Sequence, residues 1–142
     1  MKIRKAEEKD FEKVYLLLRK LFEKNDIQKS ITRKIYGGAI KNNSIFQLVA
    51  IKNNEIVGYS SFTIMEDIQS QGKIAHLREL IISEKYRGKG VGKKLLIENE
   101  KLAKRKKCID MELASNMKRK KAHKFYEKMK YEKTSYFFWR TL

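Results

Sequence analysis

A strand-like run, a glycine loop and a helical pattern follow one another between residues 73 and 106, and this order constrains the fold more than any other feature. Lys73–Ile82 is rich in apolar and β-branched residues, and Gly90–Lys106 has apolar residues at helical spacing. The loop reads Gly-Lys-Gly-Val-Gly over residues 88–92. Another apolar run, Cys108–Ala114, follows the helix, so the pattern predicts two parallel strands joined by a crossover helix.

The remaining patterns predict a mixed sheet with helices on both faces. The expected elements are a strand at Lys2–Lys5, helices at Glu8–Lys24 and Gln28–Lys41, a hairpin of Phe46–Lys52 and Glu55–Met65, a helix over Ala122–Met129, and one or two closing strands within Tyr131–Leu142. The Gly37-Gly38 pair leaves open that part of the second helix is instead a mobile lid. We therefore expect one α/β domain over residues 1–142, with a mixed, partly splayed sheet of six to seven strands.

Composition narrows the class of protein. No stretch approaches the roughly 20 apolar residues of a membrane helix, so we expect a cytoplasmic protein that does not bind membranes. Cys108 is the only cysteine and lies in an apolar run, which favours a buried, unreactive thiol; we expect no metal site. The net charge is +17, and most of the excess lies between Lys85 and Lys133. This basic region, together with the aromatic residues 136–139 and Arg140, leaves open a nucleic-acid-binding module.

Three alternating glycines at a strand-to-helix junction indicate an anion-binding loop. Their backbone N–H groups are accessible to a ligand, and the following helix contributes the positive end of its dipole. The segment lacks the Gly-x-x-x-x-Gly-Lys-Ser/Thr of a phosphate-binding P-loop and the Gly-x-Gly-x-x-Gly of dinucleotide folds. The glycine spacing alone fits either a diphosphate cradle or a turn that requires positive φ angles.

The neighbouring residues favour the first interpretation. Arg87-Gly88-Lys89-Gly90-Val91-Gly92 resembles the Arg/Gln-x-x-Gly-x-Gly/Ala signature of the GNAT superfamily of acetyl-CoA-dependent N-acetyltransferases. His76–Tyr86 is similar to the family's central strand, and Ala122–Met129 to its second cofactor-side segment. The resemblance implies a GNAT-like domain that transfers an acetyl group from acetyl-CoA to a primary amine, by direct attack in a ternary complex.

The resemblance also implies a cofactor site. The residues that would hold the diphosphate are Arg87, Gly88, Lys89, Gly90, Val91, Gly92 and Lys93. Ile81, Ile82 and Ser83 would pair with the pantetheine arm, and a backbone N–H near Ile81 would stabilise the oxyanion. Asn116 and Tyr126 would lie near the pantetheine and the sulfur, with the Tyr126 hydroxyl protonating the departing thiolate.

Glu79 is the first candidate for the general base, because partial burial on the central strand would raise the pKa of its carboxyl group. A salt bridge with the neighbouring basic residues is an equally simple interpretation of Glu79. His76 is the second candidate base. Tyr126 has helical spacing with Phe125 and Met129, so a core position is the alternative to a catalytic one.

The sequence does not identify the acceptor, which is expected to be a small-molecule amine or a protein amino group. In the family the acceptor contacts regions that correspond to Asp26–Lys41 and Ile64–Gly72. Three acidic residues there, Asp26, Glu66 and Asp67, suggest a cationic amine. Two further alternatives are a non-catalytic CoA-binding sensor and, for the aromatic C-terminal segment, a role in a homodimer.

Overall fold

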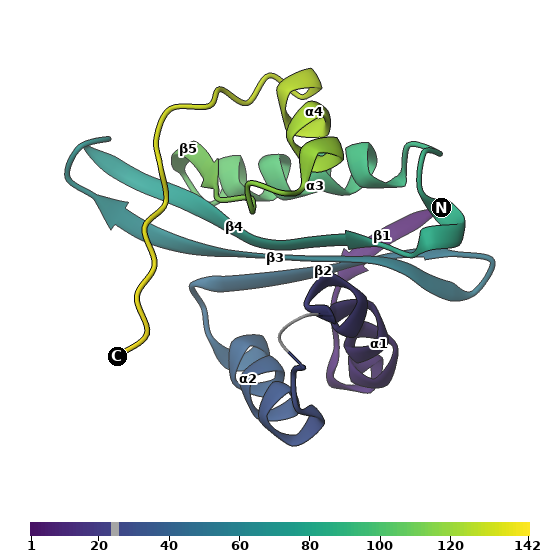
Figure 1. Ribbon diagram of the computed structural model, residues 1–142. Coiled ribbons are helices and arrows are strands. Elements are labelled where there is room, and N and C mark those ends of the chain that lie inside the picture. The colour runs from purple at the N-terminus through teal and green to yellow at the C-terminus, as the bar shows by residue number, and fades with distance from the viewer. Residues whose placement is uncertain (24–25) are drawn as a thin grey trace. The chain divides into compact units, whose positions relative to one another are not determined.

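The computed structural model describes residues 1–23 and 26–142 (Figure 1). The contacts divide the chain into two compact units, Met1–Glu112 and Leu113–Leu142. One functional domain over residues 1–142 stays a prediction.

A five-stranded sheet forms the centre of the first unit. Its strands, in spatial as well as chain order, are β1 (Lys2–Lys5), β2 (Ile45–Lys52), β3 (Glu55–Asp67), β4 (Gly72–Ile82) and β5 (Cys108–Leu113). The first four pair antiparallel. β2 and β3 form the predicted hairpin, and Asn53 and Asn54 in its turn adopt φ angles of 52° and 58°. Asparagine tolerates this left-handed conformation, which two-residue hairpin turns require.

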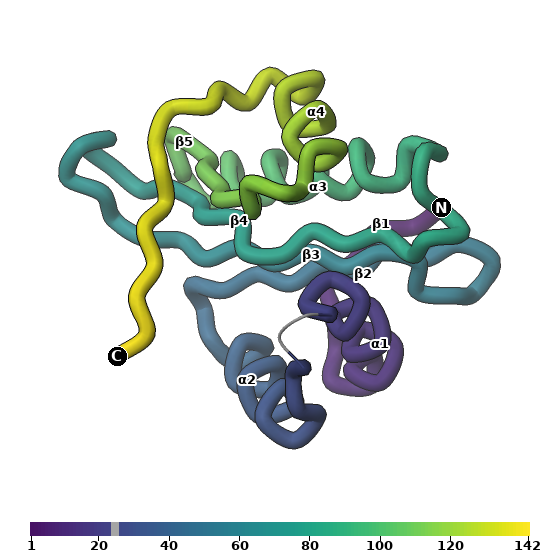
Figure 2. Tube along the Cα trace, viewed as in Figure 1, coloured from purple at the N-terminus to yellow at the C-terminus, as the bar shows by residue number. Residues whose placement is uncertain are grey.

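Helices cover both faces of the sheet in the first unit, as predicted (Figures 1 and 2). α1 (Phe11–Leu21) and α2 (Lys29–Lys41) pack on one face, where Val14, Tyr36 and Tyr59 belong to one buried cluster. α3 (Val91–Arg105) packs on the other face through Val91. The first predicted helix begins instead with a 3₁₀ turn, η1 (Glu8–Asp10), and its predicted end at Lys24 lies outside the described residues.

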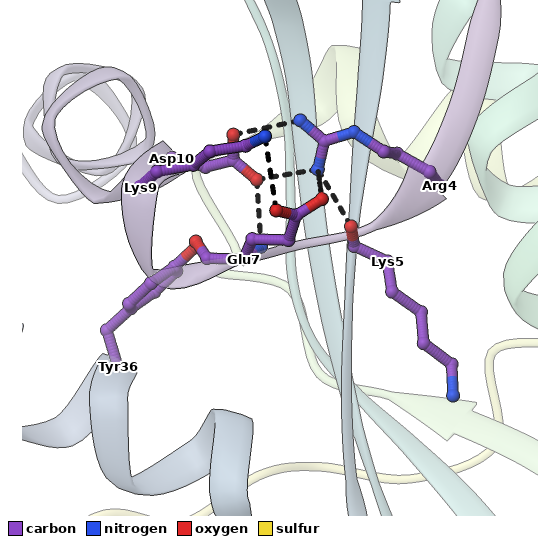
Figure 3. A network of polar contacts seen from close by, with 6 residues as sticks. All are labelled: Arg4, Lys5, Glu7, Lys9, Asp10 and Tyr36. Carbon is purple, nitrogen blue, oxygen red and sulfur yellow. Dashed lines mark hydrogen bonds and ion pairs between the residues drawn. The ribbon is translucent and has the colours of Figure 1, made fainter.

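A buried carboxylate joins β1, η1 and α2 (Figure 3). Asp10 is 5% exposed and accepts two hydrogen bonds from Arg4, at 2.7 Å from Nη1 and 2.9 Å from Nη2. The backbone N–H of Glu7 donates to Asp10 at 2.8 Å, and the Tyr36 hydroxyl donates to the Glu7 carbonyl at 2.7 Å. The hydrogen bonds from Arg4 hold the pKa of Asp10 below its usual range. This network fixes the start of α1 against the sheet.

The second unit contains α4 (Lys120–Lys128), which ends in a left-handed residue. Lys130 has a φ of 70°. Its N–H donates to the Glu127 carbonyl, and the Tyr131 N–H donates to the Tyr126 carbonyl, both at 3.0 Å. This pair of bonds is the Schellman arrangement that ends many helices, usually with glycine at the left-handed position. Lysine occupies a position where glycine would be less strained.

The prediction of six to seven strands is wrong, because no strand follows β5 in the described part of the chain. Tyr131–Leu142 was expected to supply one or two closing strands, yet most of it is exposed and without regular structure. Its aromatic residues have high β-propensity, but a strand forms only when another strand accepts its backbone hydrogen bonds. The sheet is therefore a mixed sheet of five strands.

Candidate active site

A β-bulge on β4 lies at the centre of the predicted site. Ser61 of β3 pairs with Glu79 and the next β3 residue, Phe62, pairs with Leu77, so Arg78 has no partner in the register. A bulge leaves one residue out of the hydrogen-bonding ladder and bends the strand. β4 therefore changes its side-chain alternation at Arg78, immediately before the candidate base Glu79.

Glu79 lies on the face of the sheet that α1 and α2 cover. It pairs with Ser61, two residues from the Tyr59–Ile81 pair, and Tyr59 and Ile81 both belong to the buried cluster with α1 and α2. The Ser61 hydroxyl donates a hydrogen bond to the Glu79 carboxylate. Burial raises the pKa of Glu79, while the Ser61 hydrogen bond and the charges of Arg78 and His76 oppose that rise. A carboxylate with a raised pKa and one fixed donor is suited to accept a proton.

Tyr59 and Gln47 continue the polar contacts on this face. The Tyr59 hydroxyl donates to Gln47 Oε1 at 2.5 Å, and Gln47 Nε2 donates to the Tyr36 carbonyl at 3.3 Å. Burial, together with the nearby Glu79 charge, raises the pKa of Tyr59 far above its usual value. Tyr59 therefore stays neutral and keeps its proton.

His76, the second candidate base, is paired with a residue of β5. Its Nδ1 lies 2.7 Å from Oε2 of Glu112. Nearer the start of both strands, Ile109 lies against Gly72, since a Cβ built on that glycine would be 3.1 Å from the Ile109 side chain. The two contacts occur in the same order along both strands, as in the predicted parallel pair. They place β5 beside the first half of β4.

The glycine loop follows β4 and a short 3₁₀ turn, η3 (Glu84–Tyr86). Gly88 and Gly90 have φ angles of 71° and 82°, and a Cβ added to either would meet no atom within 4 Å. Glycine is therefore required here for its backbone conformation, and the space beside the loop is open. Gly90 is the N-cap of α3, so the loop lies at the positive end of that helix.

A cavity of about 480 Å³ lies between α1 and the end of β4. Its lining combines apolar side chains with three cations and one carboxylate: Leu16, Leu17, Lys20, Ile81, Ile82, Ser83, Glu84, Lys85 and Arg87. Arg87 also donates from Nε to the Ile82 carbonyl at 3.0 Å, which holds its side chain beside the strand end. The structure thus brings together Ile81, Ile82, Ser83 and Arg87, four of the residues predicted to bind the cofactor.

Asn116 and Tyr126 belong to the second unit. Asn116 Oδ1 accepts from the Lys118 backbone N–H at 2.9 Å, and the Asn116 carbonyl lies 2.8 Å from His123 Nε2. The Tyr126 ring makes edge contacts with Phe125 and Tyr131 at centroid distances of 5.2 and 5.9 Å. Burial raises the pKa of Tyr126, so its hydroxyl keeps its proton. The roles predicted for Asn116 and Tyr126 stay predictions.

The acidic residues proposed to attract a cationic acceptor have local partners or exposed positions. Asp67 Oδ2 accepts from the Ser70 backbone N–H at 2.8 Å, within the turn between β3 and β4. Glu66 is exposed and pairs in register with Lys73. Asp26 is exposed. The structure does not gather these three carboxylates into one site.

Sequence reasoning missed three residues near the predicted chemistry. Ser61 was not identified because its contact with Glu79 depends on the β3–β4 register, which the bulge shifts. Glu112 was not identified as the partner of His76 because β5 comes from a different part of the chain. Lys20 lines the cavity from α1, although in the sequence it looks like an ordinary exposed residue of an amphipathic helix.

Residues 1–23 and 26–142 contain neither a candidate membrane helix nor a candidate metal-binding cluster. None of their helices is long and apolar enough to cross a membrane. No three His, Cys, Asp or Glu side chains in that part of the chain gather in a way that could hold a metal ion.

Comparison with known proteins identifies the family. Residues 4–131 match the model of the acetyltransferase (GNAT) family. The chain therefore belongs to this family and is a GNAT-type N-acetyltransferase by class.

The relatives include one curated enzyme and many solved structures. The chain is 27% identical over 140 residues to an aminoalkylphosphonate N-acetyltransferase of Salmonella typhimurium, covering 99% of this chain and 90% of that protein. A protein from Bacillus halodurans described as a transcriptional regulator has a similar structure, with a TM-score of 0.92, 22% identity and 99% of both chains covered. An aminoglycoside 6′-N-acetyltransferase from Acinetobacter haemolyticus gives a TM-score of 0.87, with 16% identity and 100% and 98% of the two chains covered. At these identities the structural matches show the fold alone.

Proposed function

We propose that this protein transfers the acetyl group of acetyl-CoA to the primary amine of a small molecule. The observation that carries the proposal is the cavity at the end of β4, whose lining combines the strand end with three cations and includes Arg87, the residue before the glycine loop. The family membership and the buried Glu79 carboxylate support the same reaction.

The cavity fits the chemistry of CoA. Lys20, Lys85 and Arg87 supply three positive charges against the single carboxylate of Glu84, which suits a diphosphate. The positive φ angles of Gly88 and Gly90 leave their backbone exposed at the start of α3, where N–H groups bind anions. In this proposal Lys89, Val91, Gly92 and Lys93 complete the cradle.

The end of β4 fits the amide-rich pantetheine arm. β5 lies beside the first half of β4, from Gly72 to His76, and ends at Leu113, one residue after the partner of His76. From this order we infer that the outer edge of β4 from Glu79 to Ile82 extends past β5, as the proposed splay of the sheet requires. Ile81, Ile82 and Ser83 would bind pantetheine through their backbone groups, as an added strand does. A backbone N–H at this edge would stabilise the oxyanion.

Acetyl-CoA supplies an activated thioester, and the chain supplies proton transfer. Glu79 accepts the proton that the acceptor amine must lose before its nitrogen attacks, either directly or through a water molecule. The Ser61 hydroxyl fixes the carboxylate and keeps the pKa of Glu79 from rising further. The neutral Tyr126 hydroxyl is proposed to protonate the leaving thiolate. His76 is the alternative base, although its Nδ1 faces Glu112.

The surroundings of Glu79 favour an acceptor that carries an anionic group as well as an amine. Arg78 is exposed at the bulge, and its charge together with that of His76 acts on Glu79. The Salmonella relative is named for aminoalkylphosphonates, which combine these two groups. The carboxylates of Asp26, Glu66 and Asp67 form no single site. They therefore support a cationic acceptor less strongly than Arg78 and the Salmonella relative support an acceptor with an anionic group.

A thiol-release assay with acetyl-CoA and a panel of amines tests the proposal. The panel contains aminoalkylphosphonates, aminoglycosides, polyamines and a peptide with a free amino terminus. We expect turnover with aminoalkylphosphonates to fall about 10²–10⁴-fold in Glu79→Gln, the usual contribution of a general base. Glu8→Gln, an exposed site on η1, is the matched control. Binding of acetyl-CoA without turnover of any amine would instead support a CoA sensor.

A further inference from the structure

A row of buried polar side chains crosses the sheet on the face that α1 and α2 cover. Gln47 of β2 pairs in register with Ser61 of β3, and Ser61 pairs with Glu79 of β4. Tyr59, two residues before Ser61, lies on the same face of β3. Gln47, Tyr59 and Ser61 are 7, 3 and 5% exposed. Glu79 and Ser61 belong to the proposed catalytic site, whereas Gln47 and Tyr59 have no role in it.

The backbone of α2 fixes the direction of the hydrogen bonds in this polar row. Gln47 Nε2 donates to the Tyr36 carbonyl at 3.3 Å, and a carbonyl can only accept. The amide oxygen of Gln47 therefore faces Tyr59, and this oxygen can also only accept. The Tyr59 hydroxyl accordingly donates to Gln47 Oε1, at 2.5 Å. Because a hydroxyl has a single proton, the Tyr59 oxygen is left as an acceptor towards Ser61.

Ser61 can serve Glu79 in both protonation states of the carboxyl group. When Glu79 is ionised, the Ser61 hydroxyl donates to it, as it does here. When Glu79 is protonated, it donates to the Ser61 oxygen, and the Ser61 proton then needs another acceptor. The Tyr59 oxygen is that acceptor, since the Ser61 side chain already has a hydrogen-bonding interaction with Tyr59. A buried proton without an acceptor is unfavourable, so Tyr59 supports the protonated form of Glu79.

We propose that Gln47 and Tyr59 are positioning residues for the catalytic base Glu79 and act on it through Ser61. Gln47 keeps the Tyr59 proton turned away from Ser61. Tyr59 can therefore accept the Ser61 proton whenever Glu79 holds the proton taken from the amine. Glu79 is thus hydrogen-bonded both before and after proton transfer. The inference rests on the proposed role of Glu79 as the base.

The polar row predicts changes in the pKa of Glu79 whose sign is opposite to that of simple burial. Tyr59→Phe removes the acceptor of the Ser61 proton, so the pKa of Glu79 should fall by about one unit. Gln47→Met releases the Tyr59 proton, which can then be donated to Ser61. This favours the ionised carboxylate, so the pKa should fall here too. A more apolar environment alone would instead raise the pKa of a buried carboxyl group.

The other titratable groups near the row are unchanged in these variants. Arg78 and His76 of β4 act on Glu79 through their charges. Tyr36 of α2 acts on Tyr59. A change in the pKa of Glu79 in Tyr59→Phe or Gln47→Met therefore reports on the row itself.

A ¹³C NMR titration of the Glu79 carboxyl measures this pKa without cofactor or acceptor. Tyr36→Phe is the matched control, because it removes another buried tyrosine hydroxyl, one that donates to the Glu7 carbonyl. We expect a lower pKa in Tyr59→Phe and in Gln47→Met, and no change in Tyr36→Phe. Gln47→Met should have no further effect once the Tyr59 hydroxyl is gone, since Gln47 acts through it. An unchanged or higher pKa in Tyr59→Phe would overturn the proposal, even if Gln47→Met did not fold.

The pH dependence of kcat/KM separates this inference from the proposed function. If Glu79 is the base, the acid limb of the profile reports its pKa in the free enzyme. This limb should move to lower pH in Tyr59→Phe, by as much as the NMR value falls. An acid limb that stays in place while the NMR value falls would support the positioning role and refute Glu79 as the base. An NMR value that does not fall refutes the positioning role, whatever the profile does.

Discussion

Replacing Ser61 by alanine should raise the pKa of Glu79. Ser61 is 5% exposed, and its hydroxyl donates to the Glu79 carboxylate, which lowers a pKa that burial otherwise raises. A hydrogen bond to a charged group contributes about 1.5–3 kcal/mol, and about 1.4 kcal/mol corresponds to one pKa unit. Water entering the vacated space replaces part of this contribution, so we expect a rise of about one unit.

The assay is a ¹³C NMR titration of glutamate side-chain carboxyls, with Glu79→Gln to assign the signal. It requires neither cofactor nor acceptor. Ser60→Ala is the matched control, because Ser60 is equally buried but accepts its hydrogen bond from Asn99. A pKa of Glu79 that is unchanged or lower in Ser61→Ala would refute the assigned role of the hydroxyl.

The raised pKa of Glu79 also makes the free energy of unfolding depend on pH. Glu79 has a higher pKa in the folded protein than in the unfolded chain, so the folded protein binds its proton more tightly. The stability from this proton is complete below the unfolded pKa and is lost as pH rises through the folded pKa. Ser61→Ala should extend that loss to higher pH.

Three further substitutions test the structure. Asp10→Asn should lower the free energy of unfolding by about 3 kcal/mol at neutral pH, because Arg4 then keeps only the more distant and more exposed carboxylate of Glu7, at 3.6 Å. Since the pKa of Asp10 is lowered in the folded state, the difference from wild type should shrink in acid, as urea melts at several pH values would show. Gly90→Ala should lower the free energy of unfolding by about 1–2 kcal/mol, because alanine is strained at a φ of 82°. Gly90→Asn should lower it less, since asparagine tolerates this conformation better. Equal losses in the two variants would point to a steric rather than a conformational cause. Lys130→Gly should stabilise by about 1 kcal/mol, measured by thermal unfolding, and a loss of stability would contradict the assigned left-handed cap.

Most elements of the first unit could be predicted from sequence because their apolar patterns are strong and local. The hairpin at Asn53–Asn54 and the order of β4, glycine loop and α3 follow from residue types whose backbone preferences are narrow. The number of strands could not be predicted. Residues 131–142 have the composition of a strand, but pairing depends on which edge is open, and local sequence does not contain that information.

In the candidate site, residues that are neighbours in the chain could be predicted from sequence, and residues that meet across strands could not. Ile81–Ser83 and Arg87 were predicted because they are contiguous with the glycine loop. They line one cavity, and their binding of the cofactor stays a prediction. Ser61 and Glu112 were missed because each reaches its partner from a different strand. A one-residue bulge at Arg78 decides which β3 side chain lies beside Glu79, and no sequence pattern revealed it.

The most direct test of the account is a calorimetric titration with acetyl-CoA of the wild type, Gly90→Val and Gly38→Val. Both glycines have open space where a side chain would be added, but only Gly90 has a positive φ and lies in the proposed cradle. The account predicts saturable binding by the wild type and Gly38→Val, and binding weakened at least about tenfold in Gly90→Val, since the change removes the backbone conformation that presents the N–H groups. Absence of binding in the wild type, or equal binding by all three proteins, would contradict it.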